Sequence, residues 1–198
     1  MTYATLAQLK SALRIGTADT MDDTNLTLAL NSAEEAINAW CGRTFGSAGT
    51  VDSTRYYAAG KPDDVEVDDL TSITTVEWSR DGSTWTVTTD YQAEPLNRFT
   101  DGMTWPITRL RTINAFAWPV MNGVQTVRVT GVYQFGSIPS SVTQATILQA
   151  SRVFSRLSSP LGIAAGFAEG IGAVYVRGGL DVDVQQLLMP YRRYRAAL

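Results

Sequence analysis

Residues 22–45 read DDTNLTLALNSAEEAINAWCGRTF, and this stretch decides how the rest of the chain is organised. Its apolar residues recur at steps of three and four, which is the spacing of one buried face of an α-helix. Asp22 or Asp23 can cap the first turn, and Gly42 stands where a left-handed C-terminal cap is needed. The stretch therefore predicts a core helix whose buried stripe consists of Leu26, Leu30, Ala33, Ile37 and Trp40.

The bulk composition is that of a globular chain. Of the 198 residues, 44% are hydrophobic and 18% are charged. A chain of this length buries roughly 70% of its unfolded surface, so it needs neither a disulfide nor a metal to fold. The net charge of −3 provides no basic field for nucleic acid or an anionic membrane. Because there is no apolar run of membrane-spanning length and no signal-peptide pattern, we expect no membrane association.

Charge is distributed unevenly along the chain. Residues 50–101 hold eleven acids and four bases, whereas residues 142–198 hold three acids and six arginines. The acidic middle and the basic end could meet head to tail between copies of the chain. The alternative is that both are solvated faces.

Helical patterns flank the middle of the chain on both sides. Thr5 and Gln8 have capping-box spacing and predict a first helix that ends near Ile15. A third helix is predicted to follow Pro139 and to stop at Ser158-Ser159-Pro160. Its apolar side comprises Val142, Ala145, Leu148, Val153, Phe154 and Leu157.

The last part of the chain predicts a long loop and a final helix. Residues 161–179 contain six glycines and are expected to form a mobile loop that contact with a partner could order. Asp181 and Asp183 are placed to cap the final helix or to interact with its dipole. Pro190 should kink this helix. Its apolar stripe comprises Val184, Leu187 or Leu188, Tyr191 and Tyr194.

The middle of the chain predicts antiparallel strands, among them 54–57 and 105–113. Asp81-Gly82 is typical of a two-residue hairpin turn. A turn there would place Trp78 opposite Trp85 and Val76 opposite Val87. Asn122-Gly123 predicts a second hairpin, with Trp118 opposite Val127 and Phe116 opposite Val129.

The order of these elements predicts the fold class. Helices come first, then strands, then helices, which indicates an α+β fold. We expect a single domain over residues 1–198, with a small helical bundle formed by 1–45 and 137–198. An antiparallel β unit at 50–133 would be inserted into the bundle.

The residue types exclude most catalytic chemistry. The chain contains no histidine, which excludes Ser-His-Asp and Cys-His catalysis, and one cysteine cannot provide a structural zinc site. The acidic residues at 63–69 could bind a hard cation or form an acid/base pair, but they lack EF-hand spacing and favour a solvated loop. Cys41, near a helix C-terminus, is expected to be a buried small hydrophobe. We therefore predict no metal, no cofactor and no catalytic residue.

Two arginine-containing segments are candidates for interaction. Arg43 follows the glycine cap, and we interpret it as a structural latch between the helical bundle and the β insertion. Near the C-terminus, arginine alternates with aromatic residues, a pattern that suits protein docking because both are typical interface anchors. These candidate binding residues are Tyr191, Arg192, Arg193, Tyr194 and Arg195.

Short stretches along nearly the whole chain also match a known family in their order and spacing. They are Tyr3-Ala4-Thr5-Leu6-x-x-Leu9-Lys10, Ile37-x-x-Trp40-Cys41-Gly42-Arg43-x-Phe45, Thr54-Arg55-Tyr56-Tyr57, Val67-Asp68-Asp69-Leu70, Asp90-Tyr91, Val127-x-Val129-x-Gly131, Ile138-Pro139-x-x-Val142-x-x-Ala145 and Leu187-Leu188-x-Pro190-Tyr191-Arg192. In these stretches the chain resembles the head–tail connector (head completion, or adaptor) proteins of long-tailed double-stranded-DNA bacteriophages. It departs from the family in the turn before the third helix, at 131–136, and in the length of the β insertion.

The resemblance implies a non-enzymatic structural protein of the virion. Copies would assemble in the host cytoplasm as a ring, twelve-fold by analogy, at the head–tail junction. The implied partners are the portal protein, a tail-side stopper or tail completion protein, and other copies of the chain. Double-stranded DNA would pass through the channel without sequence-specific binding. The arm at 181–198 would dock on the portal or a neighbouring copy, and we expect the fold to survive its removal.

Two other functions remain open from the sequence. Tryptophans on the hairpins could form a carbohydrate-binding or adhesion platform, for which Trp78 and Trp85 must face solvent. The acidic residues at 63–69 could serve a carboxylate-only hydrolase, for which their side chains must converge in a pocket.

Overall fold

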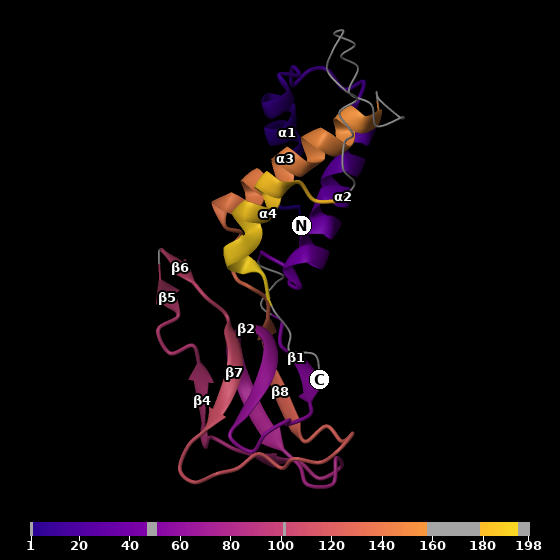
Figure 1. Ribbon diagram of the computed structural model, residues 1–198. Helices are drawn as coiled ribbons and strands as arrows, with labels where there is room; N and C mark the ends of the chain where they lie inside the picture. The colour runs from indigo at the N-terminus through magenta and orange to yellow at the C-terminus, as the bar shows by residue number, and fades with distance from the viewer. Residues whose placement is uncertain (1, 47–50, 101, 158–178, 194–198) are drawn as a thin grey trace, which may run out of the picture. The chain divides into compact units, whose positions relative to one another are not determined.

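The computed structural model describes residues 2–46, 51–100, 102–157 and 179–193 (Figure 1). Helices and strands occupy separate parts of the chain, so the predicted α+β fold class is confirmed. The chain divides into two compact units, one formed by Met1–Thr44 with Pro139–Leu198 and the other by Phe45–Ile138. We call these the helical unit and the β unit. The assignment of residues 1–198 to a single domain stays a prediction.

The described part of the helical unit contains four α-helices and one short 3₁₀-helix. Helix α3 packs against α1, α2 and α4. None of the described helices is long and apolar enough to cross a membrane. The elements are α1 (Leu6–Leu13), α2 (Asp23–Cys41), α3 (Ser140–Leu157), α4 (Val182–Leu188) and η1 (Met189–Tyr191).

The ends of α1 and α2 follow the sequence signals. Thr5 caps α1, with the Gln8 N–H donating to Thr5 Oγ1 (3.2 Å) and the Thr5 N–H donating to Gln8 Oε1 (2.7 Å), so the predicted capping box is confirmed. Helix α2 ends at Gly42, which has a φ of +65° and donates its N–H to the Asn38 carbonyl (2.9 Å). Asp22 occupies the N-cap position of α2, but its side chain makes no capping hydrogen bond.

The predicted stripe of α2 forms the centre of the helical core. Its members Leu26, Leu30, Ala33 and Ile37 are buried, and Trp40 at the end of the helix is half-buried. They pack with α1 and α3 through a cluster of buried residues. That cluster comprises Ala4, Leu9, Leu26, Ala29, Leu30, Ala33 and Ala150.

The prediction for α3 was wrong at Leu148, which is 36% exposed. The buried face instead includes the polar residues Thr146 and Gln149, which satisfy their hydrogen bonds internally; Thr146 Oγ1, for example, donates to the Val142 carbonyl (2.8 Å). This face follows one helical stripe from Val142, and Leu148 lies off it. Hydropathy alone misplaced the stripe because two of its members are polar.

Helix α4 is shorter than predicted. Val184 and Leu188 are fully buried, as their spacing indicated, but the α-helix ends at Leu188 and continues as a 3₁₀ turn that contains Pro190. Proline has no N–H and its ring clashes with the preceding turn, so the helix ends rather than kinks there. The predicted loop at 161–179 and Tyr194 lie outside the described residues, apart from Gly179.

The β unit is built on an antiparallel sheet in the order β1-β8-β2-β7-β4, and β3 also pairs with β2 (Figure 1). A separate two-stranded hairpin consists of β5 and β6. The strands are β1 (Ser53–Tyr57), β2 (Asp64–Trp78), β3 (Thr86–Val87), β4 (Tyr91–Glu94), β5 (Phe99–Thr100), β6 (Met103–Thr104), β7 (Ile107–Thr112) and β8 (Val127–Tyr133). The predicted strands at 54–57 and 105–113 correspond to β1 and β7.

The long strand β2 organises the sheet. Its register shifts between Glu66 and Leu70 against β7, and again near Ser72 against β8, so one strand bends to pair with several neighbours. The core of the β unit packs against it. The buried members of that core are Ala59, Val65, Val67, Leu70, Val76, Ile107, Leu110, Trp118, Val127 and Val129.

The predicted register of the first hairpin was wrong by one residue. Trp78 pairs with Thr86, and Glu77 pairs with Val87. The connection is longer than two residues because the Asp81 carboxylate accepts N–H groups from Ser83 (2.9 Å) and Thr84 (2.7 Å) and so builds a wider turn. A shift of one residue in the pairing turns each side chain of β3 to the other face of the sheet, so Val87 is exposed and does not lie on the face of Val76.

The second predicted hairpin does not form. Asn122-Gly123 does make a turn, closed by the Val124 N–H donating to the Met121 carbonyl (3.2 Å). However, β8 already pairs with β1 on one side and β2 on the other, so the segment that contains Phe116 and Trp118 has no edge to join.

Candidate functional site

Two segments that are distant in sequence meet at the C-terminal end of α2. The Arg193 N–H donates to the Cys41 carbonyl (2.8 Å), and the Arg192 guanidinium lies 5.0 Å from the centre of the Trp40 ring. A carbonyl in the last turn of a helix has no partner within the helix, so the backbone of residue 193 satisfies one of these groups. The Trp-Cys-Gly-Arg and Tyr-Arg-Arg stretches of the family resemblance are therefore neighbours within the helical unit.

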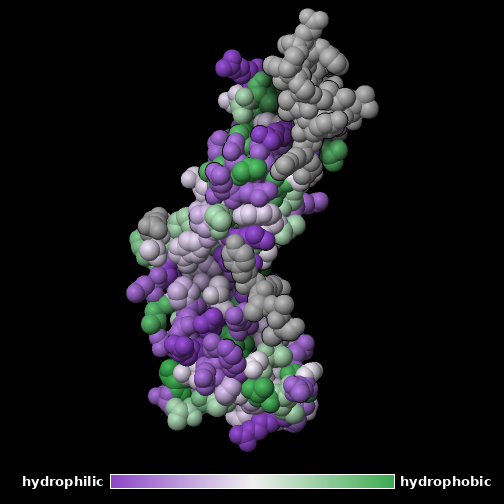
Figure 2. Space-filling model, viewed as in Figure 1, coloured by the Kyte–Doolittle hydropathy of each residue, from purple (hydrophilic) through white to green (hydrophobic). Residues whose placement is uncertain are grey.

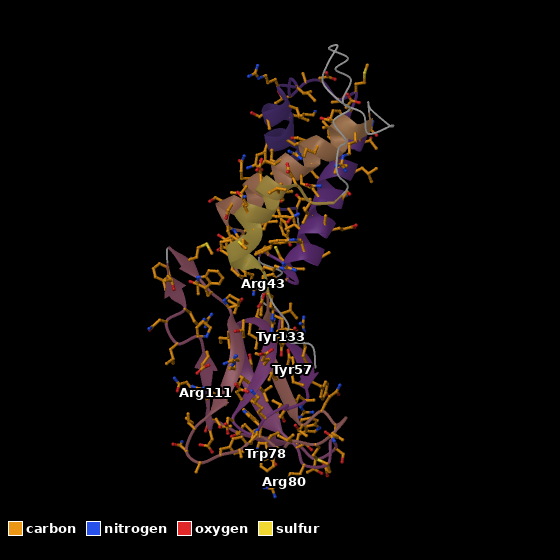
Figure 3. All side chains as sticks on the ribbon, viewed as in Figure 1. Arg43, Tyr57, Trp78, Arg80, Arg111 and Tyr133 are labelled. Atoms are coloured by element: carbon orange, nitrogen blue, oxygen red, sulfur yellow. The ribbon has the colours of Figure 1, made fainter. Side chains whose placement is uncertain are left out.

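Gly42 lets these two segments approach closely. A Cβ atom at this position would lie 3.3 Å from the Arg193 carbonyl oxygen, in addition to the strain of a positive φ. Arg43, which follows the cap, is half-buried near the end of α2 (Figure 3). Its role as a latch stays a prediction.

The electrostatics of this cluster act on Cys41, which is buried. Burial raises the pKa of the thiol from 9.0 to about 11, and the nearby positive charges of Arg43 and Arg192 only partly oppose this rise. A thiol that stays protonated is a poor nucleophile and a poor metal ligand. The interpretation of Cys41 as a buried small hydrophobe is confirmed.

The segment that contains the candidate docking residues is fixed to α3 before it reaches them. Asp181 forms an ion pair with Arg152, and the Gln149 side chain accepts the Asp181 N–H (3.3 Å) and donates to the Gly179 carbonyl (3.4 Å). Because α4 buries Val184 and Leu188, its removal would expose the core of the helical unit. The burial of these two residues argues against the expectation that the fold survives removal of residues 181–198, which stays a prediction.

The candidate docking residues differ in their surroundings. The Ser141 hydroxyl donates to Tyr191 Oη (3.0 Å), which attaches this half-buried tyrosine to the start of α3. The Arg192 side chain is exposed and that of Arg193 is half-buried. Tyr194 and Arg195 lie outside the described residues.

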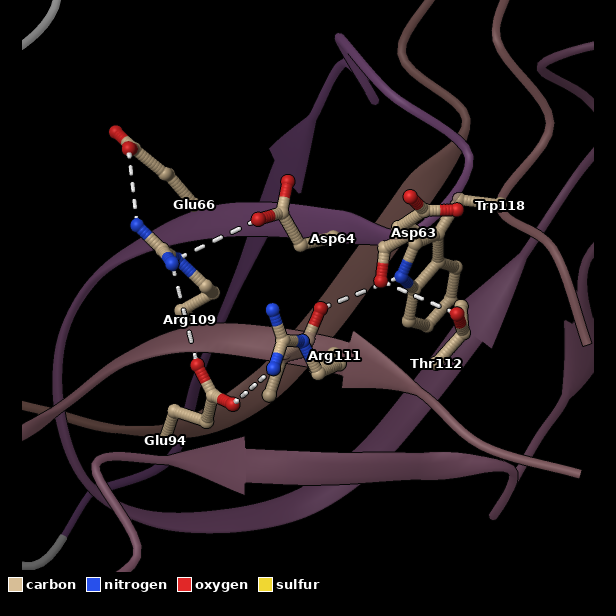
Figure 4. Close-up of polar contacts among 9 residues, drawn as sticks. Asp63, Asp64, Glu66, Glu94, Arg109, Arg111, Thr112 and Trp118 are labelled. Carbon is tan, nitrogen blue, oxygen red and sulfur yellow. Dashed lines mark hydrogen bonds and ion pairs between the residues drawn. The ribbon is translucent and has the colours of Figure 1, made fainter.

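The acidic stretch at 63–69 begins strand β2 and is not the solvated loop that we predicted. Asp64 and Glu66 flank Arg109 of β7, with N–O separations of 3.7 and 3.8 Å (Figure 4). Glu94 of β4 lies 4.0 Å from Arg109 and 3.5 Å from Arg111. Alternation along the strand buries Val65 and Val67 on the opposite face, which explains why Asp64 and Glu66 share the solvent side, whereas Asp69 further along the strand is buried.

This arrangement pairs much of the acidic charge within the sheet. Arg109, Arg111 and Arg128 come from strands outside the acidic window at 50–101, so the whole β unit holds eleven acids and seven bases. Figure 2 shows hydrophilic residues gathered over β4 and β7 on the face in view. Among the described residues, no group of three potential ligands is placed to hold a metal ion.

A second polar cluster joins β1, β2 and β8 on the sheet (Figure 3). Arg55 Nη1 donates to Asp68 Oδ2 (2.7 Å) and its guanidinium lies 4.1 Å from the Tyr133 ring centre. The Tyr57 hydroxyl also donates to Asp68 Oδ2 (3.3 Å). Burial raises the pKa values of both Tyr57 and Tyr133. Asp64 and Glu66 thus contact Arg109 whereas Asp68 contacts Arg55, so these three carboxylates do not converge as a carboxylate-only hydrolase requires.

Trp78 and Trp85 are half-buried, whereas the carbohydrate-binding alternative required both rings to face solvent. Trp118 is buried, and none of the other four belongs to the exposed residues. Trp78 packs edge-on against Phe116 (5.8 Å), whereas Trp85 packs against Tyr56 (5.5 Å). The two rings that were expected to form a pair therefore have different neighbours.

Comparison with known proteins finds similarity in structure only. No protein-family model matches the chain, and no curated protein matches it. A chain in the neck of an empty gene transfer agent (GTA) particle, computed with C6 symmetry, superposes with a TM-score of 0.55 at 18% identity. A chain in the neck of a native GTA particle, computed with C12 symmetry, superposes with a TM-score of 0.53 at 16% sequence identity. A chain in the virion of a native GTA particle superposes with a TM-score of 0.51 at 17% sequence identity.

These similarities extend over nearly the whole molecule. Each covers 97% of this chain and 90% of the other chain, so the helical unit and the β unit are both represented. At such low identity they show a shared fold. The resemblance to head–tail connector proteins that the motifs indicated is thereby confirmed as a likeness of fold to chains of phage-like neck particles.

Proposed function

We propose that this chain is a non-enzymatic structural protein of the virion neck, where copies form a ring between the portal and the tail. The observation that carries the proposal is the fold likeness over 97% of the chain to chains in particle necks, one of them computed with C12 symmetry. A subunit of this fold suits a twelve-membered ring that continues the DNA channel. The portal and a stopper or tail completion protein are its expected partners.

The cluster at the end of α2 is the proposed contact with the portal or a neighbouring copy. Arg192 is exposed beside Trp40, and Arg193 is attached through its backbone to Cys41. Their position is thus defined by α2 and does not depend on a free arm. Arginine beside aromatic rings is a frequent anchor in protein interfaces.

The proposal predicts an assembly defect when the protein is missing. Particles produced without this chain should contain filled heads that lack tails, and the purified chain should bind the portal ring of the same particle, as measured by native mass spectrometry. Particles that remain tailed and infectious or transfer-competent without the chain would contradict the proposal.

Charge reversal tests the portal contact separately. The double variant Arg192→Glu/Arg193→Glu should weaken portal binding at least tenfold while circular dichroism shows an unchanged fold. Arg80→Glu is the matched control, because Arg80 is an exposed arginine of the β unit, and it should bind like the wild type. If the wild type, the double variant and the Arg80→Glu control bind the portal equally well, the cluster at the end of α2 is not part of the portal contact.

A further inference from the structure

The β5–β6 hairpin carries exposed apolar side chains on a fixed base. Arg98 holds the base, with Nε donating to the Trp105 carbonyl (2.9 Å) and Nη2 donating to the Thr71 carbonyl (3.0 Å) of β2. The Trp105 N–H donates in return to the Arg98 carbonyl (2.7 Å), and the Trp105 ring packs on Phe135 (5.5 Å). A hairpin this short is marginal in water by itself, so these contacts define its position.

Large apolar groups on this hairpin and on the segment that leads into it face solvent. Phe99 is 74% exposed, and Leu96, which follows β4, is 67% exposed. The segment that contains both residues follows β4, the last strand in the sheet order, and Figure 1 shows the β5–β6 hairpin on the β4 side of the sheet, away from β1. Exposed apolar side chains of this size next to a fixed backbone are typical of a contact with another protein.

The opposite edge of the same sheet is also open. Strand β1 ends the sheet order and pairs only with β8 among its neighbours in that order. Tyr56 on this strand is 48% exposed, and Val51 just before it is 78% exposed. The β unit therefore presents apolar groups at both edges, one as a projecting hairpin and one as an exposed edge strand.

Arg98 and Arg55, which lie next to the two surfaces, already have partners within the chain. Arg98 donates to two carbonyls at the hairpin, and Arg55 of β1 is paired with Asp68. A contact between the two surfaces would therefore not have to bury either arginine charge unpaired. Two different surfaces at opposite edges of one subunit also satisfy the geometric requirement for a head-to-tail ring.

We propose that the β5–β6 hairpin, through Leu96 and Phe99, packs against the β1 edge of the next copy of this chain. The occupant is thus a second copy, and the contact repeats around a closed ring. This inference rests on the proposed ring and identifies the surfaces that form it. It differs from the charge-based contact between the acidic middle and the basic end, because the contact is apolar.

Cysteine pairing tests the proposed contact directly. In the double variant Phe99→Cys/Tyr56→Cys, oxidation of the assembled protein should give a ladder of disulfide-linked oligomers on non-reducing gels. Each single variant should give no ladder beyond dimer. The native Cys41 does not interfere because it is buried. Absence of a ladder from the double variant at concentrations where the wild type is oligomeric would overturn the inference.

Polar substitution tests whether the apolar groups drive association. Leu96→Ser/Phe99→Ser should raise the dissociation constant for self-association by at least tenfold in sedimentation velocity measurements. Val87→Ser is the matched control, because Val87 is 62% exposed but belongs to neither surface, and it should associate like the wild type. Raising the salt concentration from 0.1 to 0.5 M should change the wild-type constant less than threefold, whereas a charge-based contact would weaken much more.

The outcomes also separate this inference from the proposed function. A serine variant that associates like the wild type overturns the inference, and the proposed function then stands if the chain still enters the neck. A wild-type chain that stays monomeric at every concentration and in the presence of the portal overturns both. A wild type that forms rings while only the hairpin variants fail supports both.

Discussion

The helical unit and the β unit are stabilised in different ways. In the helical unit, one apolar stripe on α2 packs against α1 and α3, and a hydrogen bond from the Arg193 N–H to the Cys41 carbonyl joins distant segments at the end of α2. In the β unit, an apolar core on one side of β2 is accompanied by a network of paired charges on the solvent side. The comparison shows that local periodicity determines the first arrangement, whereas strand pairing across long sequence distances determines the second.

The largest effect is expected from the core of the β unit. Trp118→Ala should lower the free energy of unfolding by about 3–5 kcal/mol, because the ring is buried and its Nε1 donates to the Leu110 carbonyl (3.3 Å). Urea unfolding would measure the loss, and hydrogen exchange would locate it. If the two units unfold independently, protection should fall in the β unit alone. A loss below about 1 kcal/mol would contradict this view of the core.

Alkaline pH should destabilise the helical unit through Cys41. Because the folded-state pKa is raised from 9.0 to about 11, the folded protein retains this proton over a range in which the unfolded chain releases it. The retained thiol proton of Cys41 therefore contributes about 2–3 kcal/mol to the free energy of unfolding. This contribution is fully present below pH 9 and is lost as the pH rises to about 11. The Cys41→Ala variant lacks this thiol, so its free energy of unfolding, measured by urea unfolding, should fall less steeply than that of the wild type between pH 9 and 11.

Parallel slopes for the wild type and Cys41→Ala would contradict that prediction. Tyr57 and Tyr133 of the β unit also have raised pKa values, so the difference between the two proteins, and not the wild-type curve alone, isolates the thiol. Alkylation provides an independent measurement: the native thiol should react much more slowly at pH 8 than the denatured thiol.

Glycine substitutions compare backbone packing in the two units. A Cβ atom at Gly131 of β8 would lie 2.3 Å from the Ser72 carbonyl oxygen, so Gly131→Ala should cost about 1–3 kcal/mol through displacement of the sheet backbone. Gly42→Ala should cost about 1 kcal/mol, because it introduces a side chain at a positive φ. Thermal unfolding of both variants would show which one loses more stability. A larger loss for Gly42→Ala than for Gly131→Ala would contradict the prediction that the sheet backbone is the more tightly packed of the two.

The smallest effect is expected at the surface of the helical unit. Arg192→Ala should lower the free energy of unfolding by about 0.5–1 kcal/mol through loss of the contact with the Trp40 ring. Arg192→Lys keeps a cation at this position, so its free energy of unfolding should fall less than that of the alanine variant. If the alanine variant has native stability while portal binding weakens, Arg192 acts in binding alone.

The helical unit could be predicted well because its signals are local. The Thr5 capping box, the stripe from Leu26 to Ile37 and the glycine cap of α2 all lie within one helix and its immediate flanks. The error at Leu148 arose because Gly179 and Asp181, which are distant in sequence and precede α4, provide partners for Gln149 and allow this polar residue to lie on the buried face. The C-terminal candidate residues were found by composition, but their attachment to Cys41 was not.

The β unit could be predicted only in outline. Strands β1 and β7 were recognisable from their residue types, but both hairpin registers were wrong. Asp81 widened the first turn, and the occupied edges of β8 excluded the second hairpin. The acidic stretch at 63–69 was assigned to a loop because its arginine partner, Arg109, lies more than forty residues away.

By itself, the sequence determined the α+β class, the central helix with its buried stripe and its glycine cap, and the absence of histidine-dependent chemistry. Each of these depends on periodicity, caps or composition, which act over a few residues. Only the tertiary structure decided which strands pair, that the C-terminal segment lies against the end of α2, and that apolar groups remain at opposite edges of the sheet. The reason is physical: hydrogen bonds between strands have nearly the same strength in any register, so long-range packing of side chains selects among them.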